Sequence, residues 1–133
     1  MKKVQVTGLD HVVLRCADIE ASLAFYCGDL GLEPDRVDEW RRGEALFPSA
    51  RIDPGTLVDL FPAELAGGDG SASGPPNMHH FCLVIEPADL DALVEQFPDS
   101  KRADGLYGAQ GIASSLYVQD PDGNTVELRS YPA

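Results

Sequence analysis

The chain has little positive charge and no long apolar run. Ten lysines and arginines stand against 22 aspartates and glutamates, which gives a formal net charge of −12. Proteins that bind nucleic acids need clustered Lys and Arg to meet backbone phosphates, so we expect no nucleic-acid partner. Solubility is the simplest reason for the acidity. A membrane-spanning helix needs about 20 consecutive apolar residues, and without such a run we expect no membrane partner.

Cysteine is also scarce. The three cysteines make an odd count without a CxxC pair: Cys16, Cys27 and Cys82. Reduced thiols in a cytoplasmic protein fit this pattern best. The N-terminal stretch "MKKVQVTGLDHVVLRC" alternates as a strand does and has no apolar signal core, so we expect no signal peptide.

What is present is typical of a globular domain, with 44% hydrophobic and 24% charged residues. We expect residues 1–133 to form one domain of two modules, spanning 4–62 and 78–133, joined by a Gly-, Ser- and Pro-rich linker at 63–77. In the first module, the alternation at 11–16 predicts a strand, and Asp18 is a plausible N-cap for the helix that follows. Weaker strands are expected around 37–40 and 44–47, and a firmer one at 56–61.

The second module repeats the pattern. "HHFCLVIE" predicts a strand and "PADLDALVEQF" a short amphipathic helix, while "SSLYVQ" and "TVELRS" predict two strands joined through the turn Asp-Pro-Asp-Gly. Aligning the two modules puts His11 on His80 and Asp59 on Glu127. Each module therefore reads strand, helix and about three strands, with a histidine on the first strand and a carboxylate on the last.

Strand parity sorts these residues from the core. The faces that carry Val12, Val58 and Val126 are apolar and must pack on the helices, so the faces with the histidines and carboxylates look at water or into a cavity. Imidazoles and carboxylates that converge are the ligands of a divalent transition metal, or of an oxygen-activating Fe(II) site. A lone strand histidine is more often a satisfied polar residue, but the repeat favours the metal. Parity favours His80 over His79, which should face the helix side or the strand edge.

Two stretches carry a family resemblance. "DHVVLRCADIEASLAFYCGDLGLEP" and "DPDGNTVEL" are similar to the opening and closing motifs of the vicinal oxygen chelate superfamily, which includes glyoxalase I, extradiol dioxygenases and bleomycin-resistance proteins. The resemblance implies an α+β fold of two βαβββ modules that form curved mixed sheets around a cavity. It also implies a homodimer and one divalent ion per site, which would be Ni, Zn, Fe, Mn or Co. The implied ligands are His11, His80, Glu127 and, where a fourth ligand is found, Asp59.

The same resemblance also suggests residues that contact a substrate. Arg15 lies four residues after His11 on the same face, as in the His-x-x-x-Arg strand of glyoxalase I, where the arginine holds a substrate carboxylate; reaching solvent from the strand end is the other interpretation. Aromatic residues could line a cavity, although such residues are more often core. These are Trp40, Phe47, Phe61, Tyr107 and Tyr117, of which we expect Phe61 and Tyr117 to contact a small-molecule substrate.

Three functions remain open. The first is a glyoxalase-type lyase or isomerase, in which a metal acts as Lewis acid on two neighbouring oxygens, an enediolate forms and Glu127 is the general base. The second is an Fe(II) extradiol-type dioxygenase, and against it this chain is half the usual length. The third is a metal-free antibiotic-binding resistance protein, against which the retained histidines and Glu127 argue, since a polar cluster without an ion carries a desolvation cost.

Overall fold

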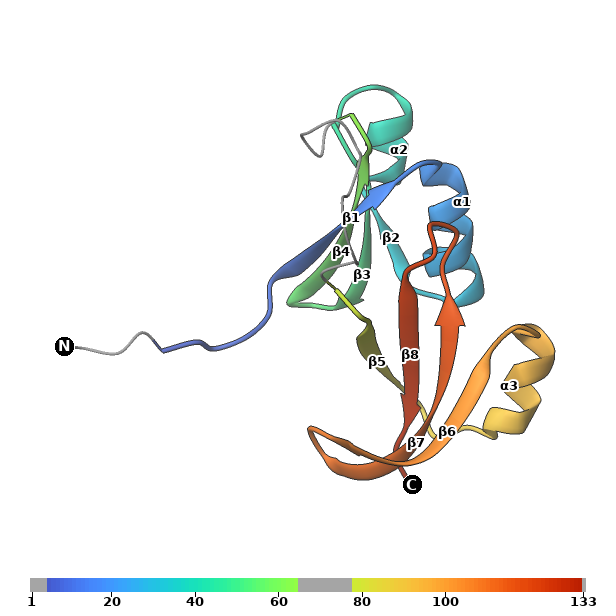
Figure 1. The fold of residues 1–133 in the computed structure, drawn as a ribbon. Helices are drawn as coiled ribbons and strands as arrows, with labels where there is room; N and C mark the ends of the chain where they lie inside the picture. The colour runs from blue at the N-terminus through green and yellow to red at the C-terminus, as the bar shows by residue number, and fades with distance from the viewer. Residues whose placement is uncertain (1–4, 65–77, 133) are drawn as a thin grey trace. The chain divides into compact units, whose positions relative to one another are not determined.

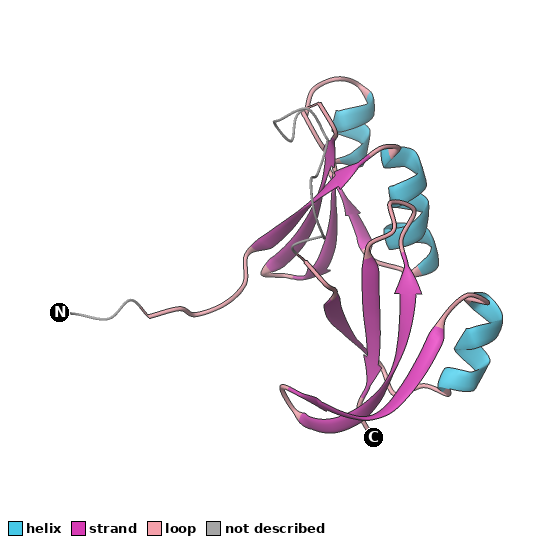
Figure 2. Ribbon diagram, in the orientation of Figure 1, coloured by secondary structure: helices cyan, strands magenta, loops and turns pink. Residues whose placement is uncertain are grey.

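The computed structural model describes residues 5–64 and 78–132. They belong to two compact units, Met1–Ser71 (unit 1) and Ala72–Ala133 (unit 2). Each unit combines one four-stranded mixed sheet with short helices (Figures 1 and 2), which is the predicted α+β architecture and is consistent with two βαβββ modules. Most of the predicted linker at 63–77 lies outside the described residues.

Unit 1 opens with the predicted strand and helix. The elements in order are β1 (His11–Cys16), α1 (Ile19–Leu23), η1 (Ala24–Asp29), β2 (Glu33–Asp35), α2 (Val37–Arg41), β3 (Ser49–Asp53) and β4 (Thr56–Pro62). Asp18 caps α1 as predicted, because its carboxylate accepts a hydrogen bond from the backbone N–H of Ala21 at 3.1 Å. The helix then widens into the π-helical turn η1 before Gly31, at φ 73°, reverses the chain.

Two weaker strand predictions in unit 1 are wrong. Residues 37–40 belong to the helix α2, and residues 44–47 form turns and bends. Val37 and Trp40 suggested a strand by residue type, but Arg36 enters the left-handed region at φ 58° and turns the chain there. Acidic residues in the first turn of α2 and Arg41 in its last turn suit the helix dipole. The strands of this region are β2 and β3 instead.

Unit 2 follows the predicted order closely. It contains β5 (Phe81–Ile85), α3 (Leu90–Gln96), β6 (Lys101–Gly108), β7 (Gly111–Gln119) and β8 (Thr125–Ser130). Asp89 caps α3, since its carboxylate accepts from the N–H of Asp91 at 3.0 Å. The turn between β7 and β8 is the predicted Asp-Pro-Asp-Gly, in which Gly123 takes φ 82°.

The two sheets have the same topology. Their strand orders are β1-β4-β3-β2 and β5-β8-β7-β6, and in each the first and last strands of the unit are parallel neighbours. In unit 1 the residue two after His11, Val13, pairs with Asp59. In unit 2 the residue two after His80, Cys82, pairs with Glu127. The two modules found in the sequence therefore also pair their first and last strands in the same register.

The predicted apolar faces form the core of each unit. Val58 and Leu60 are fully buried in unit 1, as are Leu116 and Val126 in unit 2. The helix α1 packs against β4, and α3 packs against β7. Because side chains alternate along a strand, burying Val58 and Val126 on the helix side places Asp59 and Glu127 on the other face of their sheets.

Candidate metal centre

In unit 2, a histidine and a carboxylate meet as predicted. His80 lies directly before β5, and its Nε2 is 3.1 Å from Oε1 of Glu127 on the adjacent parallel strand β8. The Nδ1 of His80 lies 2.8 Å from Nδ1 of His79, so one of these rings donates a hydrogen bond to the other. The edge of His80 also meets the ring of Tyr117, with centroids 5.6 Å apart.

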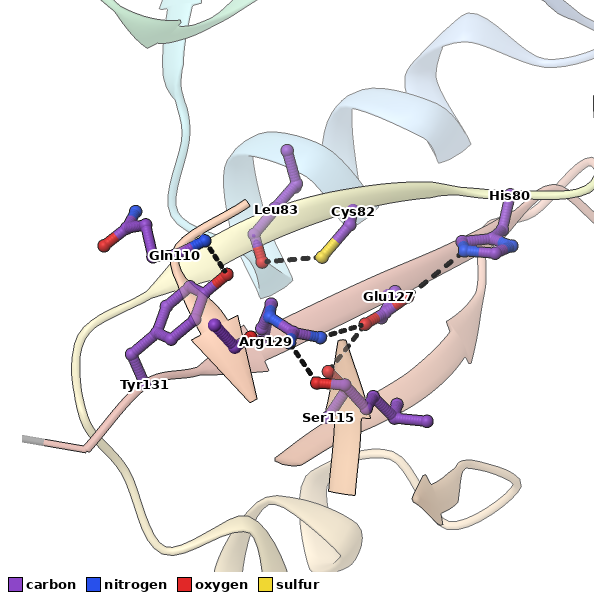
Figure 3. A network of polar contacts seen from close by, with 10 residues as sticks. His80, Cys82, Leu83, Gln110, Ser115, Glu127, Arg129 and Tyr131 are labelled. Carbon is purple, nitrogen blue, oxygen red and sulfur yellow. Dashed lines mark hydrogen bonds and ion pairs between the residues drawn. The ribbon is translucent and has the colours of Figure 1, made fainter. Parts of the chain in front are cut away.

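The second oxygen of Glu127 is occupied separately. The hydroxyl of Ser115 donates to Oε2 at 2.7 Å, and a guanidinium N–H of Arg129 donates to the same oxygen at 3.2 Å. Figure 3 shows Ser115 and Arg129 meeting Glu127 on the side away from His80. Glu127 is 5% exposed, which makes these donors necessary for a buried charge.

The surroundings of Glu127 keep its carboxylate ionised. Burial raises the pKa of Glu127, but four side-chain hydrogen bonds outweigh it and hold the pKa below the ordinary value of 4.5; the donors are Ser115, Tyr117, Cys82 and Arg129. The same cluster acts on the neighbouring thiol, since burial and the charge of Glu127 raise the pKa of Cys82 to about 11. At neutral pH the carboxylate of Glu127 is therefore ionised and the thiol of Cys82 beside it is neutral.

Unit 1 repeats the pair with looser geometry. Nε2 of His11 lies 3.8 Å from Oδ2 of Asp59, while the hydroxyl of Ser49 donates to Oδ1 at 2.6 Å. The Nδ1 of His11 hydrogen-bonds Asp10 at 2.7 Å. This bond first, and then the charge of Asp59, raise the pKa of His11 above its ordinary value.

Both pairs have the donor set and orientation of metal ligands. In each histidine Nδ1 is tied to a neighbour and Nε2 points to the carboxylate, which is how ligating imidazoles are usually oriented. Two donors about 2.1 Å from one ion are about 3.0 Å apart at a right angle and about 3.4 Å apart in a tetrahedron. The 3.1 Å of His80 and Glu127 falls in this range, and the 3.8 Å of His11 and Asp59 lies slightly beyond it.

Neither unit contains a complete site alone. Among residues 5–64 and 78–132, no group of three or more His, Cys, Asp or Glu side chains is gathered closely enough to hold a metal ion. Each unit supplies one histidine and one carboxylate.

The predicted substrate residues lie near these pairs within their own units. Arg15 is exposed on β1, where its backbone is in register with Phe61 on β4. Phe61 stacks on Phe47 with centroids 4.4 Å apart. Tyr117 contacts His80 and is in register with Glu127. Tyr107, in contrast, is 86% exposed on β6. Whether these aromatic residues line a common cavity stays a prediction.

Several site residues were not found by sequence reasoning. Ser49 and Ser115 are fully buried and hold the two carboxylates, and Arg129 is buried beside Glu127. Their positions were the only signal in the sequence. The two serines lie on the strand next to the one that carries the carboxylate, and Arg129 lies two residues after Glu127. His79 was expected to face away from His80, yet the two rings touch, because β5 begins only at Phe81 and strand parity does not apply before it.

Comparisons with known proteins agree with the fold. The model of the Glyoxalase/Bleomycin resistance protein/Dioxygenase superfamily matches residues 8–128. The chain is 30% identical to the glyoxalase domain-containing protein RDO1 of Mycosarcoma maydis, over 98% of this chain and 72% of that protein. It is 24% identical to the catechol-2,3-dioxygenase of Bacillus subtilis, over 92% of this chain and 41% of that protein.

A solved structure shows the same fold. The lactoylglutathione lyase of Agrobacterium tumefaciens superposes with a TM-score of 0.60 at 20% identity, with 94% of each chain covered. In the described part of this chain, no helix is long and apolar enough to cross a membrane. The match over most of the chain, together with the duplicated fold, shows that the protein belongs to the Glyoxalase/Bleomycin resistance protein/Dioxygenase superfamily.

Proposed function

We propose that this protein is a divalent-metal-dependent lyase or isomerase of the glyoxalase type that acts on a small substrate with two neighbouring oxygens. The observation that carries the proposal is the duplicated pair. In each unit, Nε2 of a histidine faces one oxygen of a carboxylate whose other oxygen is held by a buried serine. Imidazole nitrogens and carboxylate oxygens are donors that bind divalent transition metals.

The proposed ligands are His11, His80 and Glu127, with Asp59 as the fourth. When bound there, a divalent ion supplies Lewis acidity that makes a proton beside a carbonyl easier to remove. The protein's own part is to bring imidazole Nε2 atoms and carboxylate oxygens together. The lowered pKa of Glu127 supports this part, since the carboxylate is already deprotonated at neutral pH.

Proton transfer falls to a carboxylate at the same centre. Glu127 is the predicted general base, and it is the carboxylate with the fuller set of hydrogen bonds. Asp59 has the looser contact with its histidine, and its side chain is the second candidate for the base. The exposed Arg15 supports a substrate that carries a carboxylate, since a guanidinium binds carboxylates with paired, charge-assisted hydrogen bonds.

The test is turnover of the hemithioacetal of glutathione and methylglyoxal by the metal-loaded full chain. We expect thioester formation that depends on added Ni²⁺, Zn²⁺ or Co²⁺ and that falls by at least about 100-fold in Glu127→Gln, the loss typical of a missing acid–base group. Glu95→Gln is the matched control, because it makes the same change at an exposed glutamate of α3 away from the two pairs. No metal-dependent product above the uncatalysed rate would exclude this substrate.

A dioxygenase function is the second candidate. Beside the relationship to a catechol-2,3-dioxygenase, the contacts of His80 with His79 and Tyr117 provide a histidine and a tyrosine next to a proposed ligand. Two His and one carboxylate are also the ligand set of non-haem Fe(II) oxygenases. Protein loaded anaerobically with Fe(II) and then given catechol and air would form the yellow ring-cleavage product if this candidate is correct.

We also propose that the chain acts as a homodimer. The strands β1 and β5 are each at the edge of their sheet, and both carry an exposed valine on the histidine face: Val13 is 44% and Val84 59% exposed. Sheet edges with apolar side chains favour pairing with another element. Light scattering of the purified chain should give twice the 14.3 kDa of one chain, and a mass of one chain would contradict the proposal.

A further inference from the structure

The two oxygens of Glu127 have different surroundings. Oε1 faces Nε2 of His80, whereas Oε2 accepts hydrogen bonds from both Ser115 and Arg129. All three contacts come from different strands or segments of unit 2 (Figure 3). Oε1 is therefore the oxygen that faces the histidine, and Oε2 is the oxygen held by both donors.

Arg129 is held in place by contacts that do not involve Glu127. Its guanidinium donates to the carbonyl of Leu106 and, at 2.8 Å, to that of Gly111 in the β6–β7 hairpin, and it lies 4.9 Å from the ring centre of Tyr131. The hairpin is built to admit it, because a Cβ on Gly108 would lie 2.5 Å from the guanidinium carbon. The hairpin thus positions Arg129, and Arg129 in turn restrains Glu127.

Arg129 has no counterpart at the matching position of unit 1. The hydroxyl of Ser49 holds Asp59 as that of Ser115 holds Glu127. Two residues after Asp59, however, the position of Arg129 is taken by Phe61, which stacks on Phe47. The duplicated modules have therefore diverged at the carboxylate: the oxygen that accepts from the serine also accepts from an arginine in unit 2, where unit 1 has a phenylalanine at the matching position.

We propose that Ser115 and Arg129 are positioning residues that make Glu127 a fixed, one-oxygen ligand and present only Oε1 to the ion. The inference rests on the proposed metal function. A carboxylate can bind an ion through one oxygen or through two. The hydrogen bonds that Oε2 already accepts exclude binding through both oxygens. The neighbours of a ligand usually change metal affinity by about 10- to 100-fold when they are lost.

The test uses substitutions that keep every charge. Removing the Arg129 side chain would delete an orienting donor and also a positive charge that repels the ion, so its effect on affinity has no clear sign. Ser115→Ala deletes only the neutral donor to Oε2. Gly108→Ala leaves both Arg129 and Glu127 in the chain but forces the guanidinium to move.

The controls match these two changes. Ser114→Ala removes the neighbouring serine, which hydrogen-bonds Asp104 and not Glu127. Gly28→Ala adds a methyl group where a Cβ meets nothing within 4 Å. Calorimetric titration of the metal-free full chain with Co²⁺ should show at least about 10-fold weaker binding for Ser115→Ala and Gly108→Ala. The two controls should bind as the wild type does. Co²⁺ affinity within twofold of wild type in folded Ser115→Ala would overturn the inference.

A second readout needs no metal. In the metal-free chain, NMR relaxation of the side-chain methylene groups should show Glu127 well ordered in the wild type and loosened in Ser115→Ala and Gly108→Ala. The exposed Glu95 provides the mobile reference within the same sample. A wild-type chain that binds no Co²⁺ would refute the proposed metal function, and the NMR comparison would still decide the positioning role. A wild-type Glu127 as mobile as Glu95 would overturn it.

Discussion

Replacing Asp120 with alanine should destabilise the protein and disturb the strand that carries Glu127. Asp120 is 6% exposed in the turn between β7 and β8. Its Oδ1 accepts from the backbone N–H groups of Asp122 at 2.9 Å and Asn124 at 2.8 Å, and its Oδ2 accepts from the side chain of Asn124 at 2.8 Å. These three bonds set where β8 begins, at Thr125, two residues before Glu127.

The size of the effect follows from these bonds. A hydrogen bond to a charged group contributes about 1.5–3 kcal/mol, but the donors freed here are only partly buried and can turn to water. We therefore expect Asp120→Ala to lower the free energy of unfolding by about 2–3 kcal/mol in total, not by the sum of three full bonds. For a chain of this length that corresponds to a melting temperature about 6–12 °C lower.

Thermal unfolding of the metal-free chain, followed by circular dichroism, measures this loss. Asp120→Asn is the matched control, because its Oδ1 can still accept from both backbone N–H groups. This variant should lose less than half of the unfolding free energy that Asp120→Ala loses. A slip of β8 by one residue would turn Glu127 to the other face, so Asp120→Ala should also weaken metal binding. A melting temperature within about 2 °C of the wild type would refute the argument.

Three further predictions concern the Glu127 cluster and its turn. Because the pKa of Glu127 in the folded protein lies below 4.5, its charged hydrogen bonds stabilise the protein above pH 4.5 and are lost as the pH falls through the folded pKa. The difference in unfolding free energy between the metal-free wild type and Glu127→Gln should therefore shrink in acid and stay constant from pH 6 to 8. The pKa of Cys82, raised from 9.0 to about 11, predicts that iodoacetamide alkylates this thiol at pH 7.5 roughly 100-fold more slowly than an ordinary thiol. Alkylation of Cys82 should be faster in Glu127→Gln than in the wild type, and equal rates in the two proteins would contradict an effect of the Glu127 charge. Gly123→Ala, at φ 82°, should cost about 1–2 kcal/mol of stability, whereas Gly28→Ala, at an ordinary φ, should cost less in a denaturant titration.

Sequence reasoning succeeded where a pattern is repeated and local. The alternation at His11–Cys16, the cap at Asp18 and the turn before β8 each depend on neighbouring residues, and the structure confirms them. Comparing the two modules then paired His11 with Asp59 and His80 with Glu127 in the correct units. Parity was sufficient here because the first and last strands of each module are parallel neighbours.

Sequence reasoning failed where the structure of a segment or the burial of a residue depends on contacts distant in the sequence. The segment Val37–Arg41 has strand-forming residues but is helical, because the chain has already turned at Arg36 and the sheet edge is taken by β2. Arg129 was not singled out by sequence reasoning. It is buried only because the β6–β7 hairpin offers two carbonyl groups and the space at Gly108, which no local pattern predicts.

The central claim is that two units each contribute one histidine to a single ion. Its most direct test is the stoichiometry of Co²⁺ binding by the metal-free full chain, compared with His11→Ala and His80→Ala. We predict one ion per chain in the wild type and a loss of tight binding in both variants, since the two imidazoles come from different units. Wild-type affinity retained in His11→Ala, or two ions bound per chain, would contradict a shared site.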